Sequence, residues 1–246
     1  MPKFYAFFDN GTYKVGCTGG SIYVFDQNNT ELARFKGLSC IYQGAFRPGT
    51  NVFVAKSNVG YLLVYDLDTL SLLRKVSITR IGAQDSGFAF SPSGDLFYNI
   101  ESPVLSYLTQ LTVYDGATFD KIASYYVNDE KICLQFIETY PDEVYVFGFM
   151  RGDSGVYDYP FTAKFVDGEI RDIRRIQSND YPISEWTPWD KNDCRYLYIY
   201  KNWETEGFAK ESAKSHECLM QDPEPPRITI KHIWEINTTF QEIQAQ

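Results

Sequence analysis

The side chains best suited to metal binding gather in the C-terminal third of the chain. His216-Glu-Cys218 lies in a polar stretch, with Cys194 before it and His232 after it. Structural zinc sites commonly use Cys-x₂₋₄-Cys or His-x₃₋₅-His pairs, and a His-x-Cys triplet with distant partners does not have that spacing. Because the whole chain holds 2 His, the sequence predicts no metal site and no cofactor.

Acidic residues offer a second kind of chemistry, because two carboxylates about 5 to 9.5 Å apart can cleave a glycosidic bond. Several acids are expected near one face of the repeat structure described below: Asp85, Asp129, Glu130, Asp153, Asp180 and Glu185. A glycoside hydrolase therefore stays open as an alternative. The chain holds 32 Asp and Glu, so several on one face are expected as solvated charge. No Ser/His/Asp arrangement or phosphate-binding glycine loop is evident, and the residues favour a protein without catalytic activity.

Charge and cysteine content narrow the class of partner and the compartment. A formal charge of −9 without a large Lys/Arg cluster disfavours nucleic acid and anionic membranes as partners. The N-terminus shows no signal-peptide pattern, and no apolar run approaches the length of a membrane span. Five Cys, an odd number at irregular spacings, are typical of a reducing compartment. We therefore expect a cytoplasmic protein.

An internal repeat is the strongest pattern in the chain. A phrase of alternating β-forming residues ending in Asp occurs three times: Ser-Ile-Tyr-Val-Phe-Asp at 21–26, Tyr-Leu-Leu-Val-Tyr-Asp at 61–66 and Leu-Thr-Val-Tyr-Asp at 111–115. A second apolar stretch begins five residues after each Asp. The Asp carboxylate can accept hydrogen bonds from backbone N–H groups of the turn that follows. The pattern predicts antiparallel hairpins.

Two of these phrases follow another shared pair of strands. The segments 45–55 and 89–99 align at Phe and Pro, as Phe-Arg-Pro-Gly and Phe-Ser-Pro-Ser-Gly. Pro with Gly between apolar runs favours a turn. A unit is therefore predicted to contain strand a, a Pro/Gly turn, strand b, a loop, strand c ending in Asp, a turn and strand d. We expect Phe46, Phe90 and Phe136 at equivalent inner positions.

Five such units fill the chain, and we expect a single domain over 1–246. The units span about 3–37, 40–78, 87–127, 132–176 and 183–244, with an insert at 201–227 in the last. A period near 40–45 residues is that of four-stranded propeller blades. The sequence predicts an all-β, five-bladed β-propeller of four-stranded antiparallel blades. A β-sandwich and a six-bladed ring remain alternatives.

Ring closure is also predicted from the phase of the repeat. The first unit begins at strand a and the last ends at strand d, so neither lends a strand to the other. Closure would then be in phase, resting on side-chain packing between the first and fifth blades.

The units resemble β-propeller repeats of the WD40 and YVTN-like superfamily. The resemblance rests on the Phe/Pro/Gly turn between strands a and b and on Val-Tyr-Asp at the end of strand c. No unit carries the Trp-Asp or Gly-His pairs of true WD40 repeats. The resemblance implies an architecture but no chemistry, because function on such scaffolds depends on the loops.

The b–c loops and d–a connections lie on one face of a propeller, and on this face the b–c loops lengthen along the chain: 18–20, 57–60, 101–109, 150–160 and 201–227. Because binding residues usually lie on loops of a rigid scaffold, this face is the predicted binding surface. Its candidate residues are Asp85, Glu101, Tyr107, Asp129, Arg151, Asp153, Tyr157, Asp180 and Trp203. We expect a non-catalytic binding or scaffold module for a protein or peptide partner. The alternative is a carbohydrate or small-molecule binder, or a glycoside hydrolase, using the central opening of that face.

Overall fold

Every strand in the described part of the chain belongs to one of four antiparallel sheets. The computed structural model describes residues 6–38, 41–57, 59–78, 87–101, 109–127, 129, 131–151 and 157–175. The first two sheets contain β1 (Ala6–Asp9), β2 (Lys14–Cys17), β3 (Ser21–Phe25), β4 (Glu31–Lys36), β5 (Ile41–Phe46), β6 (Val52–Ser57), β7 (Tyr61–Asp66) and β8 (Ser71–Ser77). The third and fourth contain β9 (Phe88–Phe90), β10 (Leu96–Glu101), β11 (Gln110–Asp115), β12 (Lys121–Tyr126), β13 (Ile132–Thr139), β14 (Val144–Arg151), β15 (Tyr157–Val166) and β16 (Glu169–Arg175).

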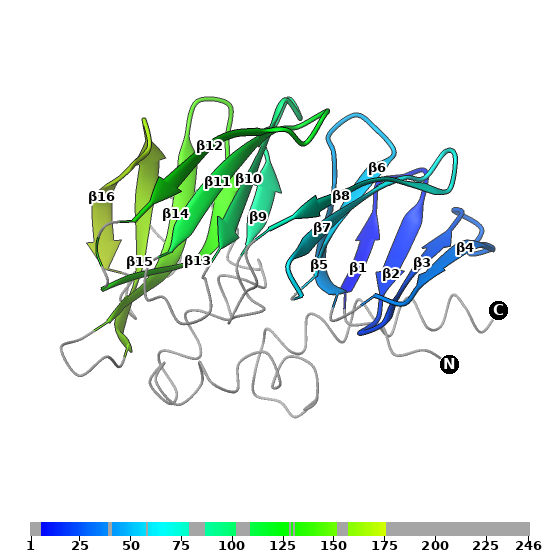
Figure 1. Ribbon diagram of the computed structural model, residues 1–246, viewed down its shortest axis with the longest axis horizontal. Helices are drawn as coiled ribbons and strands as arrows, with labels where there is room; N and C mark the ends of the chain where they lie inside the picture. Colours follow the sequence, from blue (N-terminus) through cyan, green and yellow to red (C-terminus); the bar gives the residue numbers. More distant parts are fainter. Residues whose placement is uncertain are drawn as a thin grey trace.

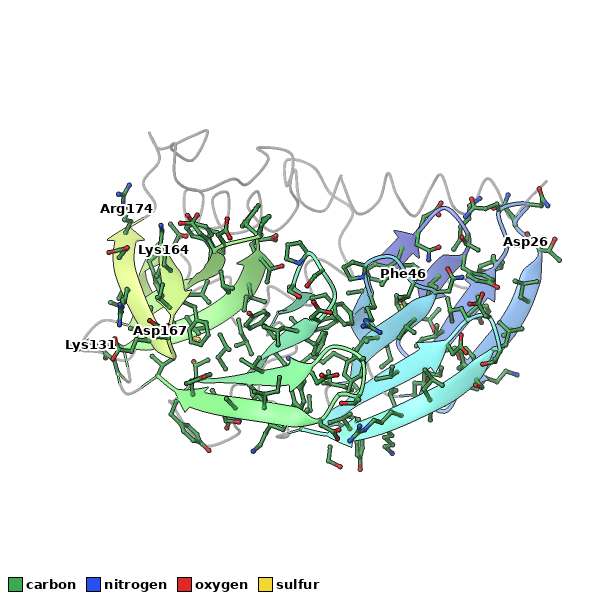
Figure 2. All side chains as sticks on the ribbon, turned by 90° about the horizontal axis from the view of Figure 1, so that it is seen from above. Asp26, Phe46, Lys131, Lys164, Asp167 and Arg174 are labelled. Carbon is green, nitrogen blue, oxygen red and sulfur yellow. The ribbon has the colours of Figure 1, made fainter. Side chains whose placement is uncertain are left out.

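Each sheet is built from four consecutive strands that pair in chain order, as in β1-β2-β3-β4. The sheets stand side by side in a curved row that also follows the chain (Figures 1 and 2). The predicted succession of strands a to d is therefore confirmed for the first four units. The fifth unit, 183–244, and its insert, 201–227, lie outside the described residues, so the blade count and the in-phase closure stay predictions.

Burial falls from the inner strands of each sheet to the outer one. The second and third strands are buried almost throughout, as in β6 and β7, because both faces of the second sheet meet neighbouring sheets. Strands covered on both faces carry near-continuous apolar runs rather than alternation, which explains Tyr-Leu-Leu-Val-Tyr in β7. The fourth strand is largely exposed, as β8 is over most of its length.

Three hydrophobic clusters fill the interfaces between adjacent sheets, which we call seams. The first seam joins the first two sheets and includes Val15, Ile22, Val24, Phe53, Leu63 and Tyr65. The second joins the second and third sheets through Val54, Leu62, Val64, Phe88, Phe90, Phe97, Tyr114 and Phe119. The third joins the last two described sheets through Ile100, Leu111, Val113, Leu134, Val146 and Phe161. The four sheets therefore pack face to face in series.

Polar contacts link the a–b turns of neighbouring sheets. Asn10 Nδ2 donates to Asn51 Oδ1 at 2.9 Å across the first seam. Arg47 Nε donates to the Gly94 carbonyl at 3.0 Å across the second. In the third, the Thr139 hydroxyl donates to the carbonyl of Phe90. These contacts fix how each sheet sits against the next.

The c–d turns show how the Asp at the end of the repeated phrase acts. Asp115 Oδ1 accepts hydrogen bonds from the backbone N–H groups of Thr118 at 2.7 Å and Ala117 at 2.9 Å. These bonds hold the pKa of Asp115 below its ordinary value. The chain then passes through a left-handed residue, Leu70 (φ 50°) in the second sheet and Phe119 (φ 57°) in the third. Phe119 is buried in the second seam, so this unusual backbone aims a large ring into the core.

The predicted equivalence of three phenylalanines holds for two of them. Phe46 pairs with Phe53, and Phe90 pairs with Phe97, each at the last ladder position before the a–b turn. In the fourth sheet Thr139 takes that position, opposite Val144, and Phe136 pairs with Phe147 three residues earlier. The prediction for Phe136 is wrong because β13 runs on to Thr139 and carries a register shift between Leu134 and Phe136.

Candidate functional site

The b–c connections of the described sheets are the segments 18–20, 58–60, 102–109 and 152–156. The third is the longest of these, so the predicted lengthening along the chain holds up to the third sheet and not at the fourth. The fourth is shorter than predicted, because β14 runs to Arg151 and β15 begins at Tyr157. Arg151 and Tyr157 pair with each other at the end of the ladder. They therefore lie at strand ends that frame the loop, and not within it.

Of the remaining candidate residues, the structure describes two, Asp129 and Glu101. Asp129 is exposed in the connection before β13, where its Oδ1 accepts from the Lys131 N–H at 2.9 Å. Glu101 is the last residue of β10 and is 2% exposed. The others lie outside the described residues: Asp85, Tyr107, Asp153, Asp180 and Trp203.

Glu101 belongs to a buried polar group in the second seam, which we call the seam cluster: Lys56, Asn99, Glu101, Gln110, Thr112 and Ser124. Register places these side chains of the third sheet on one face, since Asn99 pairs with Thr112, Thr112 with Ser124, and Glu101 with Gln110. The same face carries Phe88 and Phe97, which pack against the second sheet. The seam cluster thus extends the aromatic core toward the b–c end of the strands.

Hydrogen bonds converge on the Glu101 carboxylate. Thr112 Oγ1 donates to Oε1 at 3.0 Å, and Asn99 Nδ2 donates to the same oxygen at 3.2 Å. The Gln110 amide in turn donates to Thr112 Oγ1 at 2.7 Å and to Ser124 Oγ at 3.2 Å. Burial raises the pKa of the Tyr114 phenol, and the charge of Glu101 adds to this effect. The Glu101 carboxyl group is therefore held in place by hydrogen bonds just inside the loop end of the third sheet.

Lys56 enters the seam cluster from the second sheet. It is 4% exposed in β6, and its ammonium donates to the Ile100 carbonyl at 2.6 Å. Buried ammonium groups need such partners, because removing the charge from water is costly. The contact ties the ends of β6 and β10 together at the b–c end of the seam.

Asn99 leaves one hydrogen-bonding capacity unused within the described structure. Its side chain is fully buried, and its Oδ1 has no hydrogen-bond partner among the described residues. A buried amide oxygen of this kind accepts readily from water or another donor. The seam cluster can therefore position a charge and accept further hydrogen bonds.

The sequence indicated one member of this cluster and missed the rest. Glu101 was selected as an exposed loop residue, whereas it ends a strand and is buried. Lys56, Asn99 and Thr112 stand inside strands that are otherwise apolar, and polar residues at such positions were the available signal. Their meeting depends on the packing of two sheets, which no local pattern reveals.

Metal and thiol chemistry receive little support from the described residues. Within them, no group of three His, Cys, Asp or Glu is placed to hold a metal ion; His216, Cys218 and His232 lie outside them. Cys17 is a free, buried cysteine, and Cys133 is also buried. Burial raises the pKa of the Cys17 thiol, so the reactive thiolate is disfavoured there.

Comparisons with known proteins connect the chain to one fold. No family model matches the sequence, and no curated protein matches it. The crystal structure of the N-terminal domain of Nup159, a β-propeller, is similar with a TM-score of 0.50 at 13% identity. The match covers 72% of this chain and 48% of that one, so the chain matches about half of that domain. The likeness and the four-stranded sheets together support a propeller architecture. In the described part of the chain, no helix has the length and hydropathy needed to span a bilayer.

Proposed function

We propose that the protein is a non-catalytic binding module that presents the b–c loop face of a five-bladed propeller to a protein or peptide partner. Residues 183–244 would form the fifth blade, in phase with the others. The compartment would be the cytoplasm, where a free thiol such as that of Cys17 persists.

Buried aromatic side chains on the two end sheets support a fifth blade. On the first sheet, Tyr23 and Phe25 alternate with the residues that enter the first seam and are 9% and 2% exposed. On the fourth, Tyr145 and Phe147 alternate with Val146 of the third seam and are 2% and 0% exposed. These aromatic faces belong to the first and last described sheets of the row. A further sheet between them would complete a ring.

The observation that carries the binding proposal is the buried seam cluster at the strand ends that lead into and out of segment 102–108. Glu101 and Thr109 are the residues that flank segment 102–108, and both are buried with hydrogen bonds to fixed partners. A loop whose two ends are immobilised loses less conformational freedom on binding, which favours affinity. The polar groups face inward to hold the loop, so the loop itself is the part offered to a partner.

The proposed contact residues are the candidates on this face: Asp85, Glu101, Tyr107, Asp129, Arg151, Asp153, Tyr157, Asp180 and Trp203. Because Glu101 is buried, its proposed part is to position the loop from beneath. Arg151 and Tyr157 would act from the strand ends that frame the next loop.

Site-specific photo-crosslinking tests this proposal. A benzophenone amino acid is placed at Tyr107 or Asp129 on the loop face, or at Ser93 in an exposed a–b turn as the matched control. After irradiation in an extract of the source cells, we expect a discrete adduct from the loop-face positions and none from Ser93. An Arg151→Ala/Asp153→Ala variant should lose most of the adduct while keeping its melting temperature.

Two results would count against the proposal. An adduct that forms equally well from Ser93 would move the binding surface to the other face. Turnover of a glycoside, abolished by substitution of loop-face acids, would replace the binding role with the hydrolase alternative.

A further inference from the structure

The outer strands of the four described sheets have a charge opposite to that of the chain. Together β4, β8, β12 and β16 contain eight Lys and Arg against three Asp and Glu, a balance of +5. The whole chain carries −9, so the rest of it carries −14. In β8 and β12 the contrast is complete, because neither strand contains an acid. The outer strands, which form the rim of the molecule, therefore carry a net positive charge, whereas the protein as a whole is acidic.

The same outer strands expose aliphatic side chains at a repeated structural position. In β8, Tyr65 pairs with Leu72 and Val64 with Arg74, so Leu73 is the extra residue of a β-bulge. Ile122 has the same position in β12, and Leu32 has it in β4. Leu73 and Ile122 are 56% and 58% exposed. A bulge redirects the side chain of its extra residue, and here it turns an aliphatic group outward.

The outer edges of the second and third sheets lie next to each other. Arg74 of β8 forms an ion pair of 2.7 Å with Asp120, the residue before β12, and also donates to the carbonyl of Thr118. This contact brings the middle of β8 to the start of β12. It unites one set of residues, which we call the rim patch: Leu72, Leu73, Arg74, Lys121 and Ile122. Lys75 is left out, because it pairs with Leu63 on the other face of β8 and its ammonium lies 3.6 Å from the centre of the Tyr61 ring.

We propose that the rim patch binds an extended, acidic segment of a partner protein in which acids alternate with aliphatic residues. The cations would attract and orient the acids, while Leu73 and Ile122 would be covered by the aliphatic side chains. Among the described strands β8 is the last of its sheet, and addition to such an edge is the usual way in which an extended segment joins a sheet. This surface is separate from the loop face and would serve a second contact.

Protection against aggregation explains part of this pattern but not all of it. Lysines and bulges on an edge strand prevent unwanted edge pairing. Exposed Leu72, Leu73 and Ile122 add nothing to that protection, because each places apolar surface in water. Docking of an acidic, aliphatic segment uses both features together. A second copy of this chain fits less well, since two basic rims repel each other.

Fluorescence anisotropy with defined peptides tests the proposal on the full chain. The probe is a labelled pool of short peptides in which Glu alternates with Val, Ile or Leu, and the control pool has Lys in place of Glu. We expect saturable binding of the Glu pool that weakens at high salt, and none of the Lys pool. A Leu73→Ser/Ile122→Ser variant should bind about tenfold more weakly, the loss expected when aliphatic contacts are removed. Lys121→Glu should weaken binding about threefold, the scale of a rim charge.

Matched substitutions on the first sheet provide the control. Leu32→Ser and Lys36→Glu change the same residue types on β4 and should leave the affinity for the Glu pool unchanged, and melting curves should show all variants folded. Absence of binding by the Glu pool would refute the proposal, as would equal binding by the Lys pool. Self-association abolished by Lys121→Glu would also refute it, by assigning the patch to a second copy. None of these outcomes depends on the loop-face crosslinks.

Discussion

Glu101 and Lys56 bring charged groups into a seam whose other members are mainly aromatic and aliphatic. Such groups are tolerated when hydrogen bonds compensate them, and removing one partner exposes the full cost of burial for the others. The Glu101 carboxylate satisfies Thr112 and Asn99 at once. Its role in the fold can therefore be measured by replacing it with a side chain that cannot accept a hydrogen bond.

We predict that Glu101→Leu lowers the free energy of unfolding by about 3 kcal/mol, because two buried donors lose their acceptor. Urea denaturation followed by tryptophan fluorescence gives this value. Glu169→Leu on β16 is the control, because that side chain is exposed and its ion pair with Arg171 lies at the surface; it should change stability by less than about 0.5 kcal/mol. Equal changes in the free energy of unfolding for the two substitutions would show that the buried hydrogen bonds of Glu101 do not stabilise the fold.

The c–d turn is the element in which local sequence and core packing meet. The repeated phrase predicted an Asp that bonds the turn, and Asp115 does so. It did not predict that a bulky residue follows in the left-handed conformation, because Leu and Phe disfavour that region. In Phe119 the preference is overruled by the tertiary contact, since the ring packs at 5.3 Å from the ring of Phe97 in the seam.

A pair of substitutions at Phe119 separates backbone strain from packing. Both Phe119→Ala and Phe119→Gly remove the ring, at a cost of about 3–5 kcal/mol. Phe119→Gly should nevertheless be more stable than Phe119→Ala by about 1 kcal/mol, because Gly adopts a left-handed φ without a Cβ clash. Thermal and urea unfolding of the two variants check the order.

Phe97 is the control for this pair, because it lies within β10, where glycine is the poorer residue. There the order should reverse, with Phe97→Gly less stable than Phe97→Ala by about 0.5–1 kcal/mol. The same order at both positions would mean that the turn carries no conformational strain.

Strand boundaries show where sequence patterns stop being informative. The segments 61–66 and 111–115 were placed correctly because their alternation ends at a turn-forming Asp. β15 was predicted to begin at Phe161 but begins at Tyr157, since Pro160 lies within the strand, where a proline normally argues for a loop. The misplaced Phe136 has a similar cause, because a register shift leaves no trace in the residue types.

At the scale of the whole molecule, the described strands of each sheet all come from one unit. The first sheet takes β1 to β4 from four consecutive strands, with β1 at one edge. The proposed ring would then be closed by side chains such as Tyr23 and Phe25 and by no shared strand. The repeat alone predicted this arrangement of the first four units, because blades are local in sequence. It could not predict the seam cluster, which requires two blades in contact.

We expect the interface between the first sheet and the proposed fifth blade to open before the interior of the ring unfolds. Regions held by fewer cooperative contacts open at lower free energy, so amide hydrogen exchange should be faster in β2 and β3 than in β10 and β11. Mass spectrometry of exchanged peptides makes the comparison. Uniform protection across the sheets, or a strand from elsewhere paired to β1, would contradict in-phase closure.

The contiguity of each sheet also determines how the protein would respond to force. The second sheet is the stretch 41–77 and the third is 88–126, so tension along the chain would act on them in series and the least stable sheet would yield first. Each sheet would lose its strands one at a time and release roughly 120 Å of extended chain, at about 3.4 Å per residue. The molecule would lengthen in steps, because each sheet that has not yet yielded would stay intact.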